Sequence, residues 1–123
     1  MESGRTAIRR NLKIPIKVFD QNNDRFLGYL VDITNDGFML TIEQDIETEI
    51  HFQLKLALPM EIEGGKEFRF SATSRWFRKD PEFSFNITGF QFINLSSDEI
   101  QIVEQLIQKF CFDISSIKAG DKN

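Results

Sequence analysis

A strict alternation of apolar and polar side chains is the feature that most constrains how this chain can fold. Between residues 50 and 58 every second residue is apolar, and the apolar set is Ile50, Phe52, Leu54, Leu56 and Leu58. A period of two places neighbouring side chains on opposite faces of an extended strand, so this run indicates a strand with one buried face. A second run repeats the pattern with the apolar residues Leu12, Ile14, Ile16 and Val18. Both strands need a common core to cover their apolar faces.

Turn-forming residues divide the rest of the chain into further short strands. Residues 21–24, the pair Gly64-Gly65 and the pair Asp80-Pro81 are all typical of turns or strand ends. The segments between them predict more strands, over residues 26–33, 38–42, 67–78 and 85–92. Six or seven short antiparallel strands separated by turns indicate a mainly β fold, either a barrel or a sandwich.

Beyond residue 95 the pattern changes to a helical period. Ser96 followed by Glu99 is a capping box, in which each side chain accepts a hydrogen bond from the other residue's backbone N–H. Apolar residues then recur at helical spacing, in a stripe of Ile100, Val103, Ile107 and Phe110 with Leu106 beside them. We expect one helix of about four turns that covers an open end of the β structure.

Composition sets limits on the class of protein. The 123 residues are enough for one core, and 41% hydrophobic with 28% charged residues is ordinary for a globular domain. Thirteen Phe, against one Trp and one Tyr, predict a core filled with rings. The single cysteine, Cys111, forms no internal disulfide. With no apolar leader and no long apolar run, we expect a cytoplasmic protein without membrane insertion.

Charge is distributed unevenly along the chain. Residues 1–17 carry five Lys or Arg and one Glu, a net charge of +4, while the whole chain carries −4, so the remainder carries −8. An acidic body argues against nucleic acid as a partner, because such binding needs a continuous basic face. A short basic arm on an acidic body fits a compact anionic ligand instead.

The residues that most enzymes and metal sites need are scarce. His51 is the only histidine and Cys111 the only thiol, so no metal-ligand spacing and no Ser-His-Asp or Cys-His set is present. No glycine-rich phosphate loop precedes a helix. We therefore predict no catalytic residues, no metal and no cofactor apart from a bound ligand.

Two polar motifs stand apart from the strand pattern. The first is Arg5-x-x-x-Arg9, followed at once by Arg10, in a basic arm that we place at residues 1–11. The planar fork of arginine presents parallel N–H donors that match a pair of acceptor atoms, as in a carboxylate, a phosphate or the edge of a purine base. An isolated pair of this kind is also typical of a solvated tail.

The second motif is Asp32-x-Thr34-x-x-Gly37, between two predicted strands. A carboxylate at Asp32 can accept hydrogen bonds from N–H donors of a ligand. Gly37 supplies either a positive φ or a close approach of the backbone to a ligand. A plain turn is the alternative, because all these residue types are favoured in turns.

Together, an R-x-x-x-R and a D-x-T-x-x-G about two dozen residues later resemble the two signature motifs of PilZ domains, which are bacterial receptors for cyclic di-GMP. The resemblance runs from Arg5 to about Phe110. It implies an antiparallel six- to seven-stranded barrel with a C-terminal α-helix over residues 12–112, followed by a polar tail at residues 113–123. It also implies cyclic di-GMP as the ligand.

The resemblance implies ligand-binding roles for Arg5, Arg9, Asp32, Thr34 and Gly37, with Thr34 standing where most of the family has Ser. Further candidates are Arg10 for phosphate, and Trp76 and Arg78, which lie two apart on one strand and so share a face. Trp76 stacks on a guanine in this interpretation and packs in the core in the alternative one.

The function implied is that of a cyclic di-GMP receptor, without catalysis, which signals to an unidentified protein partner by ordering its arm. The arm has too few apolar groups to offset its backbone entropy, so we expect it to be disordered without ligand. The alternative is a PilZ-like adaptor that binds no nucleotide and acts through protein contacts alone.

Overall fold

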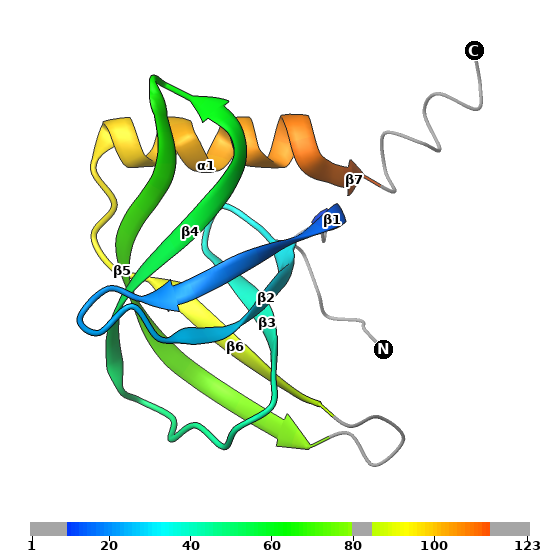
Figure 1. The fold of residues 1–123 in the computed structure, drawn as a ribbon, viewed down its shortest axis with the longest axis vertical. Helices are drawn as coiled ribbons and strands as arrows, with labels where there is room; N and C mark the ends of the chain where they lie inside the picture. The colour runs from blue at the N-terminus through cyan, green and yellow to red at the C-terminus, as the bar shows by residue number, and fades with distance from the viewer. Residues whose placement is uncertain (1–9, 80–84, 114–123) are drawn as a thin grey trace.

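The computed structural model describes residues 10–79 and 85–113, and for residues 10–15 and 111–113 it describes the backbone. The elements follow in the order β1 (Arg10–Asp20), β2 (Phe26–Ile33), β3 (Gly37–Ile42), β4 (His51–Ile62), β5 (Gly65–Lys79), β6 (Asn86–Phe92), α1 (Ser97–Phe110) and β7 (Cys111–Asp113). Figure 1 shows the strands wrapped around one core, with α1 lying across one end.

Six of the strands close into an antiparallel barrel. The sheet order is β2-β3-β6-β5-β4-β1, and a further pairing of β2 with β1 closes the ring. β7 adds to the start of β1, where Arg10 lies opposite Asp113 and Leu12 opposite Cys111. The predicted mainly β barrel with a C-terminal helix is therefore confirmed.

Phenylalanine rings fill much of the barrel, as the composition predicted. Phe38 stacks on Phe90 with ring centroids 5.1 Å apart, and it meets Phe70 edge to face at 5.4 Å. Phe68 stacks on Phe70 at 4.9 Å, and all four rings are buried. Aliphatic residues of every barrel strand from β1 to β4 complete the core.

The strand predictions agree with the structure apart from their ends. The predicted strand at residues 26–33 has the observed bounds, while β1 starts at Arg10 rather than at residue 12. Arg10 and Asn11, which we had assigned to the arm, therefore belong to a strand. β7 is a strand that the sequence did not predict, and it takes Asp113 out of the expected polar tail.

The turn between β4 and β5 lies one residue earlier than predicted. Its central residues are Glu63, with φ 50°, and Gly64, with φ 82°, and they are flanked by the pair Ile62 and Gly65. Two successive positive φ values are typical of a type I′ turn, which matches the twist of a hairpin. Gln105 of α1 donates to the Glu63 carboxylate and so connects the helix to this turn.

The helix begins with the predicted capping box. The backbone N–H of Glu99 donates to Ser96 Oγ at 3.1 Å, and the N–H of Ser96 donates to Glu99 Oε1 at 2.9 Å. Val103 and Leu106 are buried against the barrel. Ile100, which we expected in the apolar stripe, is 41% exposed, so the buried stripe starts one turn later. Among the described residues no helix is both long and apolar enough to span a membrane.

An ion pair connects the β1–β2 hairpin to β4. Lys55 Nζ lies 2.9 Å from Asp24 Oδ1 in the hairpin turn, where Asp24 has a φ of 58°. The hydrogen bond from Lys55 lowers the pKa of Asp24, and the same bond raises the pKa of Lys55. The stability that Asp24 contributes is therefore present above its ordinary pKa and is lost as the pH falls through the lowered one.

Candidate functional site

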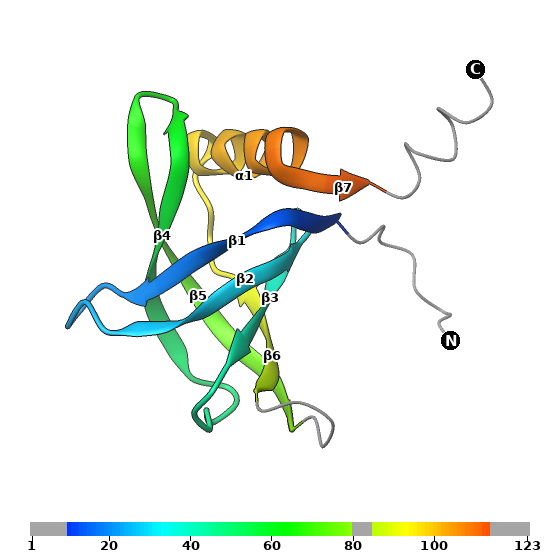
Figure 2. The same cartoon turned by 45° about the vertical axis from the view of Figure 1, so that its right-hand side comes forward.

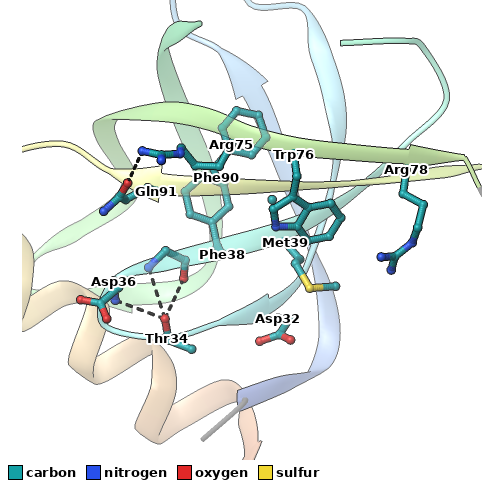
Figure 3. A pocket seen from close by; sticks show the side chains of 12 residues that line it. Asp32, Thr34, Asp36, Phe38, Met39, Arg75, Trp76, Arg78, Phe90 and Gln91 are labelled. Atoms are coloured by element: carbon teal, nitrogen blue, oxygen red, sulfur yellow. Dashed lines mark hydrogen bonds between the residues drawn. The ribbon is translucent and has the colours of Figure 1, made fainter. Parts of the chain in front are cut away.

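A pocket opens where β2 ends and β3 begins, and the far halves of β5 and β6 form its other wall (Figure 3). Its volume is about 700 Å³. The lining residues are Asp32, Thr34, Asp36, Gly37, Phe38, Met39, Arg75, Trp76, Arg78, Gly89, Phe90 and Gln91. Five of the eight predicted site residues are in this set, namely Asp32, Thr34, Gly37, Trp76 and Arg78.

Asp32 lies at the end of β2 and is only 4% exposed. The pairing of β2 with β3 slips by one residue between Leu30 and Asp32. On its other side Asp32 lies opposite Asn11 of β1, and Ile33 lies opposite Arg10. A carboxylate is thus held on a strand that is paired along both edges, so its position is set by the barrel and not by a loop.

The Thr34 hydroxyl organises the turn that follows. It accepts hydrogen bonds from the backbone N–H groups of Asp36 and Gly37, both at 3.2 Å, and it lies 3.4 Å from Gly37 O. The N–H of Thr34 donates to the same carbonyl at 2.8 Å. These bonds form a Ser/Thr turn in which the hydroxyl shapes the rim of the pocket.

Of the two alternatives given for Gly37, the positive φ is wrong, because among the described glycines only Gly64 has a positive φ. A Cβ at Gly37 would lie 2.1 Å from the Phe90 carbonyl oxygen of β6. The glycine therefore permits a close approach of two strand backbones at the start of β3.

Trp76 lies on the pocket wall and not in the core, which rules out the alternative interpretation. It is 37% exposed, and its indole covers Gly89, where a Cβ would lie 2.2 Å from Trp76 Nε1. The reason is a β-bulge, because the β5–β6 register shifts between Ser74 and Trp76. Before the bulge the even-numbered residues of β5 face the core; after it Phe77 faces inward instead.

Arg75 also lines the pocket, and the sequence analysis missed it. Arg75 donates from Nη1 to Gln91 Oε1 at 2.8 Å, and its Nε lies 3.4 Å from Glu49 Oε2. Arg78 lies with its guanidinium carbon 5.1 Å from the centre of the Trp76 ring, a cation–π contact. Figure 3 shows Trp76 between Met39 and Arg78, with Arg75 directed toward Gln91.

A buried hydroxyl holds the bulged strand against the loop before β4. Ser74, fully buried, donates from Oγ to the Glu47 carbonyl at 2.7 Å and accepts from the Ile50 N–H at 3.1 Å. No sequence motif marks this serine, because its partners lie more than twenty residues earlier in the chain. The position of Arg75 therefore depends on contacts between distant segments.

Arg5 and Arg9 lie outside the described residues. Arg10 is the first residue of β1, and its backbone lies opposite Ile33, next to Asp32. The segment that carries the R-x-x-x-R motif is thus joined to the barrel at Arg10, beside the end of β2 that lines the pocket.

The pocket combines a buried carboxylate, two arginines and a partly exposed indole, all carried on strands. It therefore offers a hydrogen-bond acceptor, two cationic donors and an aromatic ring. In the part of the chain that the structure describes, no group of three or more His, Cys, Asp or Glu residues could hold a metal ion.

Two features define the class of domain. One is a closed six-stranded antiparallel barrel with a helix across one end, and the other is a polar pocket formed by the ends of four strands. The family model described as the PilZ domain matches residues 4–112, and the chain belongs to this family. No curated protein sequence matches the chain.

Solved structures of PilZ proteins share this fold. The PilZ domain of YcgR from Escherichia coli, solved with c-di-GMP, aligns with a TM-score of 0.63 and 17% identity over 98% of this chain and 100% of that one. The inhibitor of motility MotI/DgrA of Bacillus subtilis aligns with a TM-score of 0.67 and 15% identity, over 88% of this chain. PlzA of Borreliella burgdorferi, in complex with c-di-GMP, gives 0.58 and 14% over 92%. The chain spans about half of the length of MotI/DgrA (51%) and of PlzA (48%).

Proposed function

We propose that this protein is a receptor for cyclic di-GMP. The observation that carries the proposal is that Asp32, Thr34 and Gly37 line the same pocket as Trp76 and Arg78, although some forty residues separate the two groups. Family membership supports it, and so do the c-di-GMP complexes of YcgR and PlzA. The ligand would bind without chemical change, because binding groups are what the pocket offers.

Six of the predicted site residues contact the ligand in this proposal. The Asp32 carboxylate accepts from guanine N1–H and N2–H₂, and the arm residues Arg5 and Arg9 donate to O6 and N7 on the opposite edge. Trp76 offers a face on which a purine stacks, and Arg78 beside it neutralises a phosphate. Arg10 is a further phosphate ligand.

Two of the motif residues act chiefly on the shape of the site. Thr34 already accepts two backbone hydrogen bonds, so we assign it the turn and not a strong contact with the ligand. Its extra methyl group, relative to the usual Ser, does not disturb those bonds. Gly37 permits the strand contact beside it. Replacement of Ser by Thr at this position is therefore compatible with nucleotide binding.

The signal, in this proposal, passes to a protein partner through ordering of the arm over the pocket. The arm reaches the barrel at Arg10, beside Asp32. Ligand phosphates would neutralise its arginines and so offset the entropy of ordering about ten residues.

Calorimetric titration with cyclic di-GMP, and in parallel with cyclic di-AMP, tests the receptor function. Adenine carries an amine where guanine has O6, so we expect a clear preference for the guanine nucleotide. Asp32→Ala should weaken binding roughly ten- to a hundred-fold, about 1.5–3 kcal/mol, through loss of a charge-assisted contact. Asp98→Ala is the matched control, because Asp98 is an exposed carboxylate in the first turn of α1.

Thermal unfolding of each variant separates weak binding from loss of fold. No affinity for cyclic di-GMP in a folded parent protein, or equal affinity for both nucleotides, contradicts the receptor function. The first of these results would leave the adaptor without nucleotide as the function of this barrel.

A further inference from the structure

We propose that a second pocket, at the start of β2 and the end of β3, binds an arginine side chain of a protein partner. This pocket has a volume of about 310 Å³ and shares no lining residue with the nucleotide pocket. Its wall includes three aromatic residues, Phe26, Tyr29 and Phe85, together with Glu43 and Gln44. The inference does not rest on nucleotide binding.

The aromatic side chains stand out because two of them are exposed. Phe26 is 44% exposed and Tyr29 38%, and their ring centroids lie 5.2 Å apart at an interplanar angle of 69°. Phe19 meets Phe26 from the other side at 5.8 Å and 67°. Three rings thus form a row of edge-to-face contacts along the β1–β2 hairpin. Partly exposed aromatic clusters of this kind are typical of interaction surfaces.

One end of this row already holds a cation. Lys55 Nζ lies 5.6 Å from the centre of the Phe19 ring, held there by its ion pair with Asp24. Among the described residues no cation lies over Phe26 or Tyr29, at the other end of the row. Both rings are partly exposed, so they can contact a cation from outside the chain.

The charge of the pocket favours such a cation. The loop before β4 carries four carboxylates, of which Asp45 pairs with Lys79 at 3.3 Å and Glu49 with Arg75. Glu43, which lines the pocket, and Glu47 form no ion pair within the described part of the chain. A carboxylate beside two exposed rings is complementary to a positive group with a flat face.

Arginine fits this combination better than lysine does. Its planar guanidinium stacks on a ring and at the same time donates two parallel bonds to a carboxylate, whereas an ammonium is a strongly hydrated point charge. The pocket is less than half as large as the nucleotide pocket, a size suited to one long side chain. Arginine and aromatic residues are also the groups most enriched in protein–protein interfaces.

The test uses blocked tripeptides as probes for the partner. Amide shifts of the full chain are followed by NMR during titration with acetyl-Gly-Arg-Gly-amide, and with the same peptide carrying Lys or Gln in the central position. We expect the arginine peptide to shift the amides of Gly28, Tyr29, Thr41, Glu43 and Gln44 most strongly. The lysine peptide should shift them less and the glutamine peptide least.

Matched variants separate the pocket from general surface charge. Glu43→Gln and Tyr29→Ala should each weaken binding of the arginine peptide roughly two- to five-fold, the size of a partly exposed cation–π or ion-pair contact. Glu47→Gln removes the same charge from the same loop at a residue that does not line the pocket, and it should leave the affinity unchanged.

The proposal is overturned if the arginine peptide shifts no amide of this pocket. It is also overturned if the glutamine peptide binds equally well, or if Glu47→Gln weakens binding as much as Glu43→Gln does. Both lining variants change exposed side chains, and an amide spectrum that keeps its dispersion shows that they fold.

Discussion

Gly89 of β6 leaves room for the indole of Trp76, the only tryptophan of this protein. The indole of Trp76 rests directly on the glycine, in the space that a larger residue would need for its Cβ. The ring is thus held against the strand by this contact, and it stays 37% exposed beside the Arg78 guanidinium. Such a ring can stack on a ligand at little cost in side-chain entropy.

Gly89→Ala tests this contact. The added Cβ would lie 2.2 Å from Trp76 Nε1, so the ring must move, and we expect a loss of about 1–3 kcal/mol in the free energy of unfolding together with a changed tryptophan emission. Urea denaturation followed by tryptophan fluorescence measures both, because Trp76 is the only tryptophan in the sequence.

Gly65→Ala is the control for Gly89→Ala. A Cβ at Gly65 would meet its nearest neighbour, Glu67 O, at 3.7 Å, an ordinary contact. Equal losses in the two variants would mean that glycine is required in these strands for backbone reasons alone, and not for the ring.

At the scale of elements, α1 depends on a local signal at its start. Ser96→Ala removes the acceptor of the Glu99 N–H and should lower the free energy of unfolding by about 1 kcal/mol. Ser97→Ala changes the next residue, which is also exposed, and should have little effect. Chemical denaturation of both variants measures the difference. A loss as large for Ser97 as for Ser96 would contradict the role of the capping box.

The strands that the sequence predicted are those with one face on the core. Half-burial imposes the period of two, which was visible directly in residues 12–18 and 50–58, and turn residues marked out the other four barrel strands. β7, at Cys111–Asp113, was not visible, because three residues are too few for a period and the strand exists through its pairing with β1. The ends of strands were also hard to predict, because pairing with a neighbouring strand determines where a strand ends, and local composition does not.

The site was predictable only in part. Asp32, Thr34 and Gly37 were found because turn chemistry is local and the family motif is short. Arg75 was missed because nothing local distinguishes it from the other polar residues on the outer face of β5, and its partners Gln91 and Glu49 lie far away in the chain. Gln91 was missed likewise, since its relevance comes from its contact with Arg75.

At the scale of the whole molecule, the start of β1 connects the pocket to the C-terminal strand. Arg10 lies opposite Ile33 on one side and opposite Asp113 on the other. We expect cyclic di-GMP to slow amide hydrogen exchange at residues 10–12, at the turn of residues 34–37 and at residues 111–113. Exchange in the middle of α1, around Val103, should change little.

This pattern follows from the proposal that the ligand orders the arm that leads into β1. Hydrogen exchange with mass spectrometry measures it, and an unrelated nucleotide such as ATP is the control. If the segment around Arg9 is already protected without ligand, then the arm is a fixed structural element and its ordering is not the signal.

The pairing of Arg10 with Asp113 means that the order of the strands along the chain could be changed by circular permutation. Partners across an antiparallel ladder have Cα atoms about 4.5–5.5 Å apart, close enough for a two-residue turn to join them. Figure 2 shows β7 lying beside the start of β1, so a short linker from residue 113 to residue 10 would join the two ends of the described chain. A circular permutant that joins residue 113 to residue 10 and opens at the exposed Glu63–Gly64 turn would keep all six barrel strands with their present neighbours. In such a chain the arm no longer precedes β1. The contribution of the arm to ligand binding can then be measured separately from the contribution of β1 to the stability of the fold.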